Sequence, residues 1–359
     1  MKLRFALLAL AAVLATFARR LLGRKRHRAW SVSQEIAVEV LTRNGAVLRA
    51  LPPDRARARM DALALPPSTK VRKEKRTGTA GSALAAPRPS TNVRVEKRAE
   101  GTWFLPDGAP GDAAIVYAHG GSFVIGSVRS YADLLSRLAA ATGVRVLGFD
   151  YRLAPEHRFP AALDDTVAAA TAAGVPPHRL LLAGDSAGGN LALGAALELA
   201  RRRQAPGGLI LLSPWVDLTC SRASVQRNAR LDWGDGGYLK HWVPLYLPAG
   251  VAADDPRVSP LNADLSGLPP IQLHVGTAEL LHDEVVELSE RAIWANVGVD
   301  LRKWPDMVHG WALLPAVFPA AADTLRACAT FTAERLSLSR SSRPNPLPLP
   351  AAAPPPRSR

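Results

Sequence analysis

Short apolar runs alternate with longer helical patterns through most of the chain. The runs with strand character are 115–118, 144–149, 180–182, 209–212, 271–275 and 299–304. The stretches with helical spacing are 131–141, 161–173, 187–203, 283–295 and 320–336. This alternation predicts an α/β fold in which helices cover both faces of a mostly parallel sheet.

The alternation breaks at both ends and once in the middle. Residues 30–92 predict two helices around Pro52-Pro53 and a connector rich in Pro, Ser, Lys and Arg. The main α/β domain is expected at 93–336, beginning with edge strands over 93–105. Residues 217–253 lose the pattern and predict an insertion that forms a cap with the N-terminal helices. The Pro-rich tail 337–359 is expected to be disordered.

Residues 1–29 combine an apolar run from Phe5 to Ala18 with a basic block from Arg19 to Arg28. As a helix the run covers about 21 Å, less than a hydrocarbon core of about 30 Å. Arg19-Arg20 stand where a cleavable signal needs small residues. A short anchor or interfacial helix with peripheral membrane contact is one interpretation; a marginal signal sequence or an incorrect start is the other. A cytoplasmic or membrane-associated protein is expected rather than a secreted one.

Charge is unevenly distributed over the 359 residues. The net charge of +14 and the pI near 10.5 would ordinarily suggest a nucleic-acid partner. However, residues 1–100 hold 22 Lys/Arg against 7 Asp/Glu, whereas residues 101–336 hold 19 against 24. The part of the chain with the regular α/β pattern is therefore mildly acidic, and no nucleic-acid partner is expected.

Little in the sequence suggests a metal or a cofactor. Cys220 and Cys328 lie far apart and outside any metal-like spacing, so buried free thiols are favoured over a disulfide. Neither a metal nor an organic cofactor is expected.

A candidate nucleophile stands at the turn between an apolar run and an Ala/Leu-rich helix. The turn reads Gly184-Asp185-Ser186-Ala187-Gly188. A serine becomes nucleophilic only beside a base and oxyanion donors, so it must stand clear of both flanking elements. Glycines at 184 and 188 leave room for such a strained corner, and the helix start offers unpaired N–H groups.

Several further motifs occur in a fixed order along the chain. They are His119-Gly120-Gly121, the octapeptide at 150–157, Gly184 to Asn190, Ser213-Pro214-Trp215 and His309-Gly310. Together they resemble the hormone-sensitive-lipase-like esterases of the α/β-hydrolase fold, over residues 30–336. The resemblance implies a catalytic triad in the order serine, acid, histidine, with Ser186 as nucleophile.

The resemblance also implies an oxyanion hole formed by the N–H groups of Gly120, Gly121 and Ala187. Glycines allow the backbone to approach a substrate carbonyl, and each fixed donor typically contributes about 3 kcal/mol. His119 is expected to hold this loop by hydrogen bonds rather than to transfer protons.

Four histidines follow Ser186, and His309 fits the base best because it lies in a loop after a strand. His241 falls in the presumed cap, His274 in an apolar strand, and His282 beside the acid candidates. Family spacing places the acid at Glu279, although many relatives have Asp there. Asp283 is the alternative acid, expected instead to cap the helix that it begins.

Other conspicuous residues have structural interpretations. Arg152 and Glu156 are expected to pair and fix the loop after a strand. Five aromatic residues are expected either to line an acyl or alcohol pocket or to lie in the core. They are Phe123, Trp215, Trp233, Tyr238 and Trp242.

The sequence thus predicts a serine carboxylesterase that acts on small to medium apolar esters or lactones through an acyl-enzyme. An amidase or deacetylase with the same triad is the close alternative. A ligand-binding receptor of the same fold is less favoured, because such relatives have lost the triad histidine and His309 is present.

Overall fold

The computed structural model describes residues 2–64, 70–72 and 92–338. The predicted disordered tail falls almost wholly outside these residues, as does most of the connector at 66–90. Both expectations therefore stay predictions.

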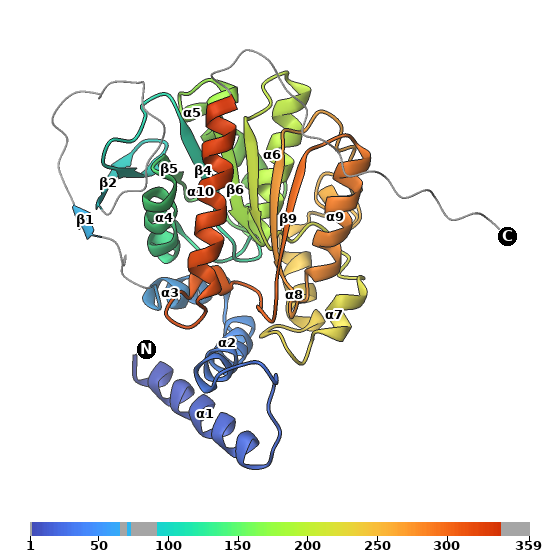
Figure 1. The fold of residues 1–359 in the computed structure, drawn as a ribbon. Coiled ribbons are helices and arrows are strands. Elements are labelled where there is room, and N and C mark those ends of the chain that lie inside the picture. The colour runs from blue at the N-terminus through green and yellow to red at the C-terminus, as the bar shows by residue number, and fades with distance from the viewer. Residues whose placement is uncertain (1, 65–69, 73–91, 339–359) are drawn as a thin grey trace.

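The described strands form one nine-stranded, mostly parallel sheet (Figure 1) in the order β1-β2-β3-β5-β4-β6-β7-β8-β9. Their bounds are β1 Lys70–Arg72, β2 Asn92–Arg98, β3 Gly101–Pro106, β4 Ala114–Ala118, β5 Arg145–Gly148, β6 Leu180–Asp185, β7 Gly208–Leu212, β8 Ile271–Gly276 and β9 Val299–Trp304. Only β3 runs antiparallel to its neighbours β2 and β5. The mostly parallel sheet is as predicted.

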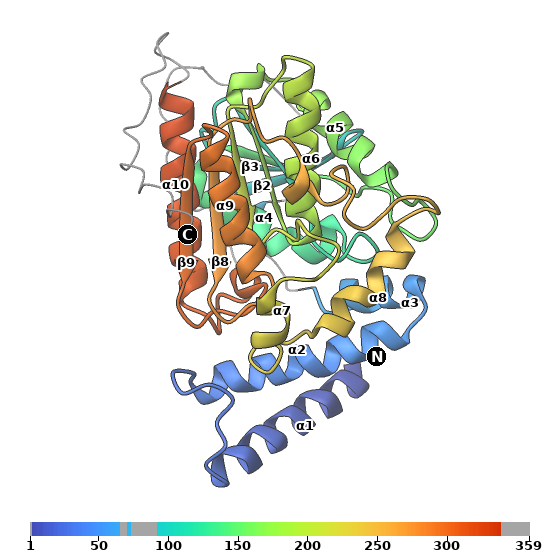
Figure 2. The ribbon, with the colours of Figure 1, turned by 90° about the vertical axis from the view of Figure 1, so that its right-hand side faces the viewer.

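Two layers of helices enclose the sheet (Figures 1 and 2). On one face lie α4 Val128–Thr142 and α10 Ala320–Leu338; on the other lie α5 Ala161–Ala172, α6 Ala187–Arg201 and α9 His282–Trp294. Strands β4, β6, β7 and β8 are buried along their whole length. This is why they read as continuous apolar runs in the sequence.

Further helices gather beyond the carboxyl ends of the parallel strands (Figure 2). They are α1 Lys2–Leu21, α2 Val32–Ala50, α3 Pro53–Ala62, α7 Ala223–Arg227 and α8 Gly236–Tyr246. The last two come from the segment expected to be a cap insertion. A Cβ on Gly45 of α2 would meet Tyr238 at 3.3 Å and Trp233 at 3.5 Å, so α2 packs closely on the insertion.

Local sequence signals explain where α2 and α3 begin. Ser31 and Gln34 form a capping box at the start of α2, and α3 starts at Pro53. Among the helices of the described ranges, none combines the length and the apolar character needed to cross a lipid bilayer.

Candidate active site

Ser186 lies at the sharp turn between β6 and α6. Its backbone has φ 52° and ψ −123°, a strained conformation for a residue with a side chain. A Cβ on Gly184 would lie 2.3 Å from the carbonyl oxygen of Gly188, and one on Gly188 would lie 2.0 Å from that of Ala118. The corner can therefore close only with glycine at both positions.

Hydrogen bonds from neighbouring loops fix the backbone of Ser186. Its N–H donates to the carbonyls of Leu212 and Ser213, both at 3.1 Å, and its carbonyl accepts from Trp215 N–H at 2.9 Å. The residue is 8 % exposed. The serine is thus held against the segment that follows β7.

Glu279 and His309 form a buried carboxylate–imidazole pair. Glu279 Oε2 lies 3.0 Å from His309 Nδ1, and the glutamate is completely buried. Its other oxygen, Oε1, accepts from the N–H of Gly276 at 2.5 Å and from the hydroxyl of Ser213 at 2.7 Å. The glutamate side chain folds back over its own loop, as expected for a residue longer than aspartate.

The environment of His309 favours its protonated form. Burial by itself would lower the pKa, but the hydrogen bond and charge of Glu279, with the charges of Asp232 and Asp185, raise the pKa of His309 above its ordinary value. The side chain remains 15 % exposed. The imidazole of His309 is therefore largely buried but still accessible to a substrate.

Ser213 connects the predicted catalytic residues. Its carbonyl accepts from Ser186 N–H, while its hydroxyl donates to Glu279, which in turn holds His309. The structure thus brings the serine corner and the Glu279–His309 pair into one neighbourhood.

The alternative acid, Asp283, has other partners. Its carboxylate accepts from Arg227 at 2.6 and 3.0 Å and from the N–H of Ser224 at 2.9 Å. Chiefly through the hydrogen bond from Arg227, the pKa of Asp283 falls to about 2. The expectation that Asp283 caps α9 is wrong, because Leu281 occupies the N-cap position and Asp283 lies in the first turn.

The loop after β4 carries His119, Gly120 and Gly121. A Cβ on Gly120 would lie 2.4 Å from Asp185 Oδ2, and one on Gly121, at φ +118°, would lie 2.0 Å from the carbonyl oxygen of Ile125. The N–H of Gly120 donates to Asp185 Oδ1 at 2.9 Å. This contact corrects the expectation for Gly120, whose N–H is already engaged in holding the loop.

The carboxylate of Asp185 holds this loop in place through hydrogen bonds. Besides the N–H of Gly120, its carboxylate accepts from the hydroxyls of Tyr117 at 3.0 Å and Tyr131 at 2.8 Å. Burial raises the pKa of Asp185, although all three hydrogen bonds favour its charged form. Asp185 is therefore a structural support for the loop beside the serine.

His119 is placed as expected for a residue that holds the loop. Its Nδ1 lies 2.8 Å from the carbonyl oxygen of Gly120, and its ring stacks on Tyr151 with centroids 4.2 Å apart. Burial lowers the pKa of His119, which keeps the ring neutral.

The other three histidines that follow Ser186 have different side-chain surroundings, although the N–H of His282 donates to the carbonyl of Glu279 at 3.4 Å. His241 is exposed on α8, and His282 Nδ1 lies 2.9 Å from Asp283. His274 is buried in β8, where it accepts from Trp304 Nε1 at 3.0 Å, and burial lowers its pKa to about 3.

The structure corrects the predicted pairing of Arg152 with Glu156. Arg152 binds Asp165 instead, at 2.8 Å, whereas Glu156 binds Arg57 of α3 at 2.6 Å. Arg57 also donates to the carbonyl of Val124 at 2.7 Å. These contacts tie α3 to the loop that contains Gly121.

Of the five aromatic residues, four are buried and Trp233 is half-buried. Trp233 Nε1 donates to the carbonyl of His309 at 2.8 Å. Phe123 stacks on Tyr246 with ring centroids 3.8 Å apart. Trp233 therefore covers the histidine loop, while Phe123 packs within the core.

Sequence reasoning missed two polar residues that shape the site. In the sequence, Ser213 stands out only as part of the motif Ser213-Pro214-Trp215, which assigns it no role. Asp232 lies in the insertion, where no pattern singles it out; its carboxylate accepts from the N–H groups of His309 at 3.1 Å and Leu280 at 2.9 Å. Burial, reinforced by the charge of Glu279, raises the pKa of Asp232 to about 6.

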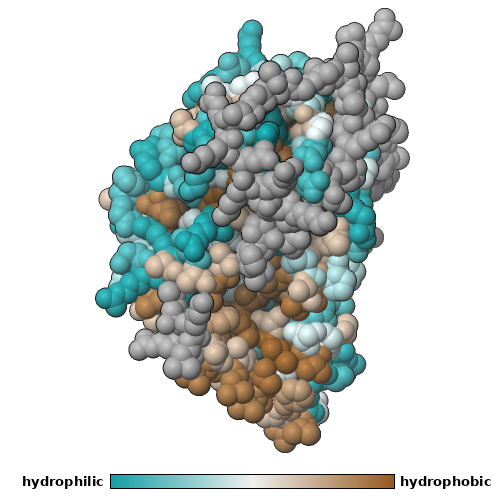
Figure 3. Space-filling model, turned by 90° about the vertical axis from the view of Figure 1, so that its left-hand side faces the viewer, coloured by the Kyte–Doolittle hydropathy of each residue, from teal (hydrophilic) through white to brown (hydrophobic). Residues whose placement is uncertain are grey.

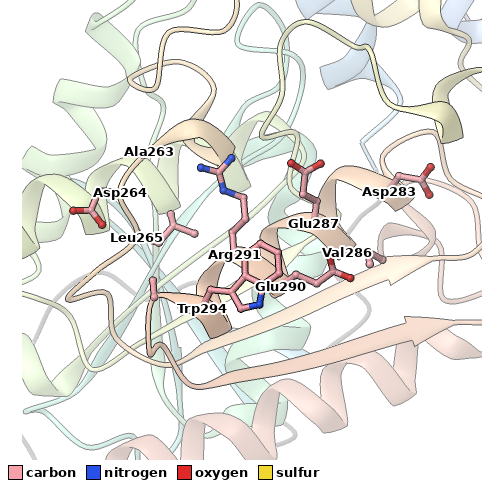
Figure 4. A pocket seen from close by; sticks show the side chains of 10 residues that line it. Ala263, Asp264, Leu265, Asp283, Val286, Glu287, Glu290, Arg291 and Trp294 are labelled. Atoms are coloured by element: carbon pink, nitrogen blue, oxygen red, sulfur yellow. The ribbon is translucent and has the colours of Figure 1, made fainter. Parts of the chain in front are cut away.

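An open groove of about 840 Å³ lies away from these residues (Figure 4). It runs between α9 and the loop at 263–265 and is lined by Glu287, Arg291 and Trp294, with Asp283 at its rim. None of Ser186, Glu279 and His309 lines it. Within the described ranges, no three His, Cys, Asp or Glu side chains are grouped as ligands for a metal ion.

The fold and the site define a protein class. A mostly parallel α/β sheet with a serine at a strand–helix corner, beside a buried acid–histidine pair, is the architecture of an α/β-hydrolase. A family model described as the alpha/beta hydrolase fold matches residues 115–313. The chain belongs to this family and, within it, to the hormone-sensitive-lipase-like esterases.

Individual relatives agree with this assignment. An acetyl-hydrolase of Streptomyces hygroscopicus is 39 % identical over 235 residues, which cover 64 % of this chain and 78 % of that protein. An ethyl acetate hydrolase of Pseudomonas putida is 36 % identical over 229 residues, covering 61 % and 72 %. The protein is an esterase or lipase-type hydrolase.

Solved structures support the same conclusion. A hormone-sensitive lipase from a metagenome library superposes with a TM-score of 0.70 at 35 % identity, covering 83 % of this chain and 97 % of that one. An esterase of the bacterial hormone-sensitive lipase family gives a TM-score of 0.70 at 33 % identity, covering 82 % and 98 %.

Proposed function

We propose that this protein hydrolyses small to medium apolar carboxylic esters through an acyl-enzyme on Ser186, with His309 as base and Glu279 as acid. The observation that carries the proposal is the 3.0 Å contact between Glu279 Oε2 and His309 Nδ1, next to the serine corner. A buried carboxylate at Nδ1 keeps the proton on that nitrogen and leaves Nε2 free to accept another.

In the first half of the reaction, His309 Nε2 takes the proton of the Ser186 hydroxyl as Oγ bonds to the ester carbonyl carbon. The carbonyl oxygen becomes an oxyanion. The protonated imidazole then gives its proton to the leaving alkoxide, the carbon–oxygen bond breaks, and an alcohol leaves. Glu279 stabilises the imidazolium that exists between these steps.

In the second half, water replaces the alcohol. His309 removes a proton from water, the hydroxide attacks the acyl carbon, and the proton returns to Ser186 Oγ as the carboxylic acid departs. The free enzyme is regenerated without a metal or an organic cofactor.

The oxyanion is stabilised by the N–H groups of Gly121 and Ala187 in this mechanism. Ala187 is the first residue of α6, where an N–H has no partner within the helix. Gly121 lies in a loop held by Arg57 and by Asp185, through its contact with Gly120. Gly120 thus acts as a support for the donors rather than as a donor itself.

The names of relatives support the substrate class. One relative is named an acetyl-hydrolase and another an ethyl acetate hydrolase; both names specify an acetyl group, which supports a small acyl group. Lactones also remain candidate substrates, because a cyclic ester presents the same carbonyl to Ser186.

Hydrolysis of p-nitrophenyl acetate and butyrate by Ser186→Ala tests the proposal. We expect turnover to fall by at least about 10³-fold, because the nucleophile is lost. Ser266→Ala, at an exposed position, is the matched control and should keep wild-type turnover. Full activity in Ser186→Ala would contradict the proposal.

An amidase or deacetylase using the same residues is the second candidate. Comparing p-nitrophenyl and p-nitroanilide substrates with the same acyl group separates the two, since an amine leaving group needs fuller protonation. The receptor alternative is weaker, because His309 is not only present but bound to Glu279.

A further inference from the structure

Helix α1 turns five of its large apolar side chains toward solvent. Leu7, Leu10, Leu14, Phe17 and Leu21 are between 50 % and 87 % exposed. Their spacing of three and four residues places them within an arc of about 80° on a helix of 3.6 residues per turn. We call this set the α1 stripe; from Leu7 to Leu21 it is about 21 Å long at 1.5 Å per residue.

The opposite face of α1 packs against α2 and mixes small, polar and half-buried apolar residues. Ala12 and Thr16 are completely buried. Arg19 binds Glu39 at 2.9 Å, and Arg20 binds the buried Glu35 at 3.1 Å. An ordinary surface helix exposes mainly polar residues, so the exposed α1 stripe needs an external partner.

The charge around the α1 stripe favours an anionic partner. Residues 1–29 contain eight Lys or Arg and no Asp or Glu. Arg24, Lys25 and Arg28 are exposed just beyond the end of the helix. A second copy of α1 would bring the same positive charges together in either orientation, whereas anionic lipid headgroups would be attracted.

The position of the stripe relates it to the active site. Figure 3 shows apolar residues gathered at the foot of the molecule, where α1 lies in Figure 1. Helix α2 separates α1 from Trp233, which packs against Gly45 and covers the His309 loop. Arg26, in the connector after α1, donates to the carbonyl of Asp232 at 2.6 Å.

We propose that α1 is an interfacial helix that holds the cap side of this enzyme against an anionic lipid surface. The α1 stripe lies among the headgroups and upper acyl chains, parallel to the membrane, and Arg24, Lys25 and Arg28 contact the phosphates. In this orientation the active site lies close to the lipid surface. This inference does not depend on which residues carry out the hydrolysis.

Vesicle co-sedimentation of the full chain tests the proposal. We expect binding to vesicles of phosphatidylcholine with phosphatidylglycerol, and binding at least about tenfold weaker to phosphatidylcholine alone. Leu10→Ser/Leu14→Ser/Phe17→Ser and, separately, Arg24→Gln/Lys25→Gln/Arg28→Gln should each weaken binding by at least about tenfold.

The matched control is Ile293→Ser/Trp294→Ser, which removes exposed apolar side chains on α9 instead. It should bind vesicles like the wild type. All variants should hydrolyse soluble p-nitrophenyl butyrate at the wild-type rate, which shows that they fold. Equal binding to neutral and anionic vesicles, or unchanged binding in the stripe variant, would overturn the proposal, as would a stripe-dependent dimer without vesicle binding in sedimentation velocity.

Discussion

At the residue scale, the choice between two neighbouring acids decides how His309 is held. Glu279 and Asp283 are four residues apart, and both can orient an imidazole. The buried Glu279 contacts His309, whereas Asp283 is engaged with Arg227. We therefore expect only one of the two carboxylates to matter for turnover.

Replacing each acid by its amide tests this choice. Glu279→Gln should lower kcat by up to about 10⁴-fold, because the amide no longer fixes the imidazole tautomer. Asp283→Asn should change kcat less than about threefold, since its contacts are structural. Steady-state kinetics on p-nitrophenyl butyrate measures both, and the reverse order would assign the acid to Asp283.

The pH profile reports on the same contact. His309 must be neutral to accept a proton, so kcat/KM should rise with pH through its pKa, which lies above the ordinary 6.5. In Glu279→Gln the charge and the charge-assisted hydrogen bond of Glu279 that raise the pKa of His309 are lost, while burial and the charges of Asp232 and Asp185 remain. The residual activity should then show its acid limb at lower pH. Asp283→Asn should leave the limb in place, and an unmoved limb in Glu279→Gln would contradict this account.

At the element scale, the β6–α6 corner depends on the absence of side-chain atoms. Strand and helix meet so closely that a Cβ at Gly188 would overlap the carbonyl of Ala118 in β4. Backbone atoms of a central strand cannot move aside without breaking the sheet. The corner that positions Ser186 is thus built into the packing of three elements.

Gly188→Ala tests this packing. We expect the free energy of unfolding to fall by about 3 kcal/mol or more, with loss of esterase activity, because the added methyl group forces the corner open. Gly111→Ala is the matched control, since a Cβ there meets nothing within 4 Å. Urea unfolding followed by tryptophan fluorescence measures both, and equal stability of the two variants would refute the argument.

At the scale of the whole molecule, a buried carboxyl beside the active site makes stability depend on pH. The pKa of Asp232 rises from 3.8 to about 6 on folding, mainly through burial. Between these pH values the folded state binds more protons than the unfolded state. The contribution of Asp232 to stability is therefore full below pH 3.8 and is lost as the pH rises to about 6.

Asp232→Asn removes this dependence. The difference in the free energy of unfolding, variant minus wild type, should increase by up to about 3 kcal/mol as the pH rises through that interval. A constant cost of the substitution does not affect this increase. Urea titrations at several pH values measure the difference. Asp235→Asn, at the exposed N-cap of α8, is the control. A difference that does not change with pH would show that folding does not raise the pKa of Asp232.

Positive and negative charges are also unevenly distributed between the N-terminal part of the chain and the rest. The positive excess of residues 1–100 lies on the N-terminal part of the chain, and the mildly acidic 101–336 form most of the sheet and its helices. The charge balance of the complete chain therefore says little about the catalytic body.

The sequence by itself determined the alternating elements, the glycine corner at Ser186 and the preference for His309, whereas the preference for Glu279 came from the resemblance to the esterase family. The strand and helix periods are local because near neighbours set them, and the glycine corner is a short motif that the sequence shows directly, although it packs against β4. Only the tertiary structure decided which polar groups meet across the fold. The partners of Arg152 and Glu156, the engagement of Gly120 with Asp185, the place of Asp232 beside His309 and the outward face of α1 all depend on packing between distant segments, which no spacing along the chain encodes.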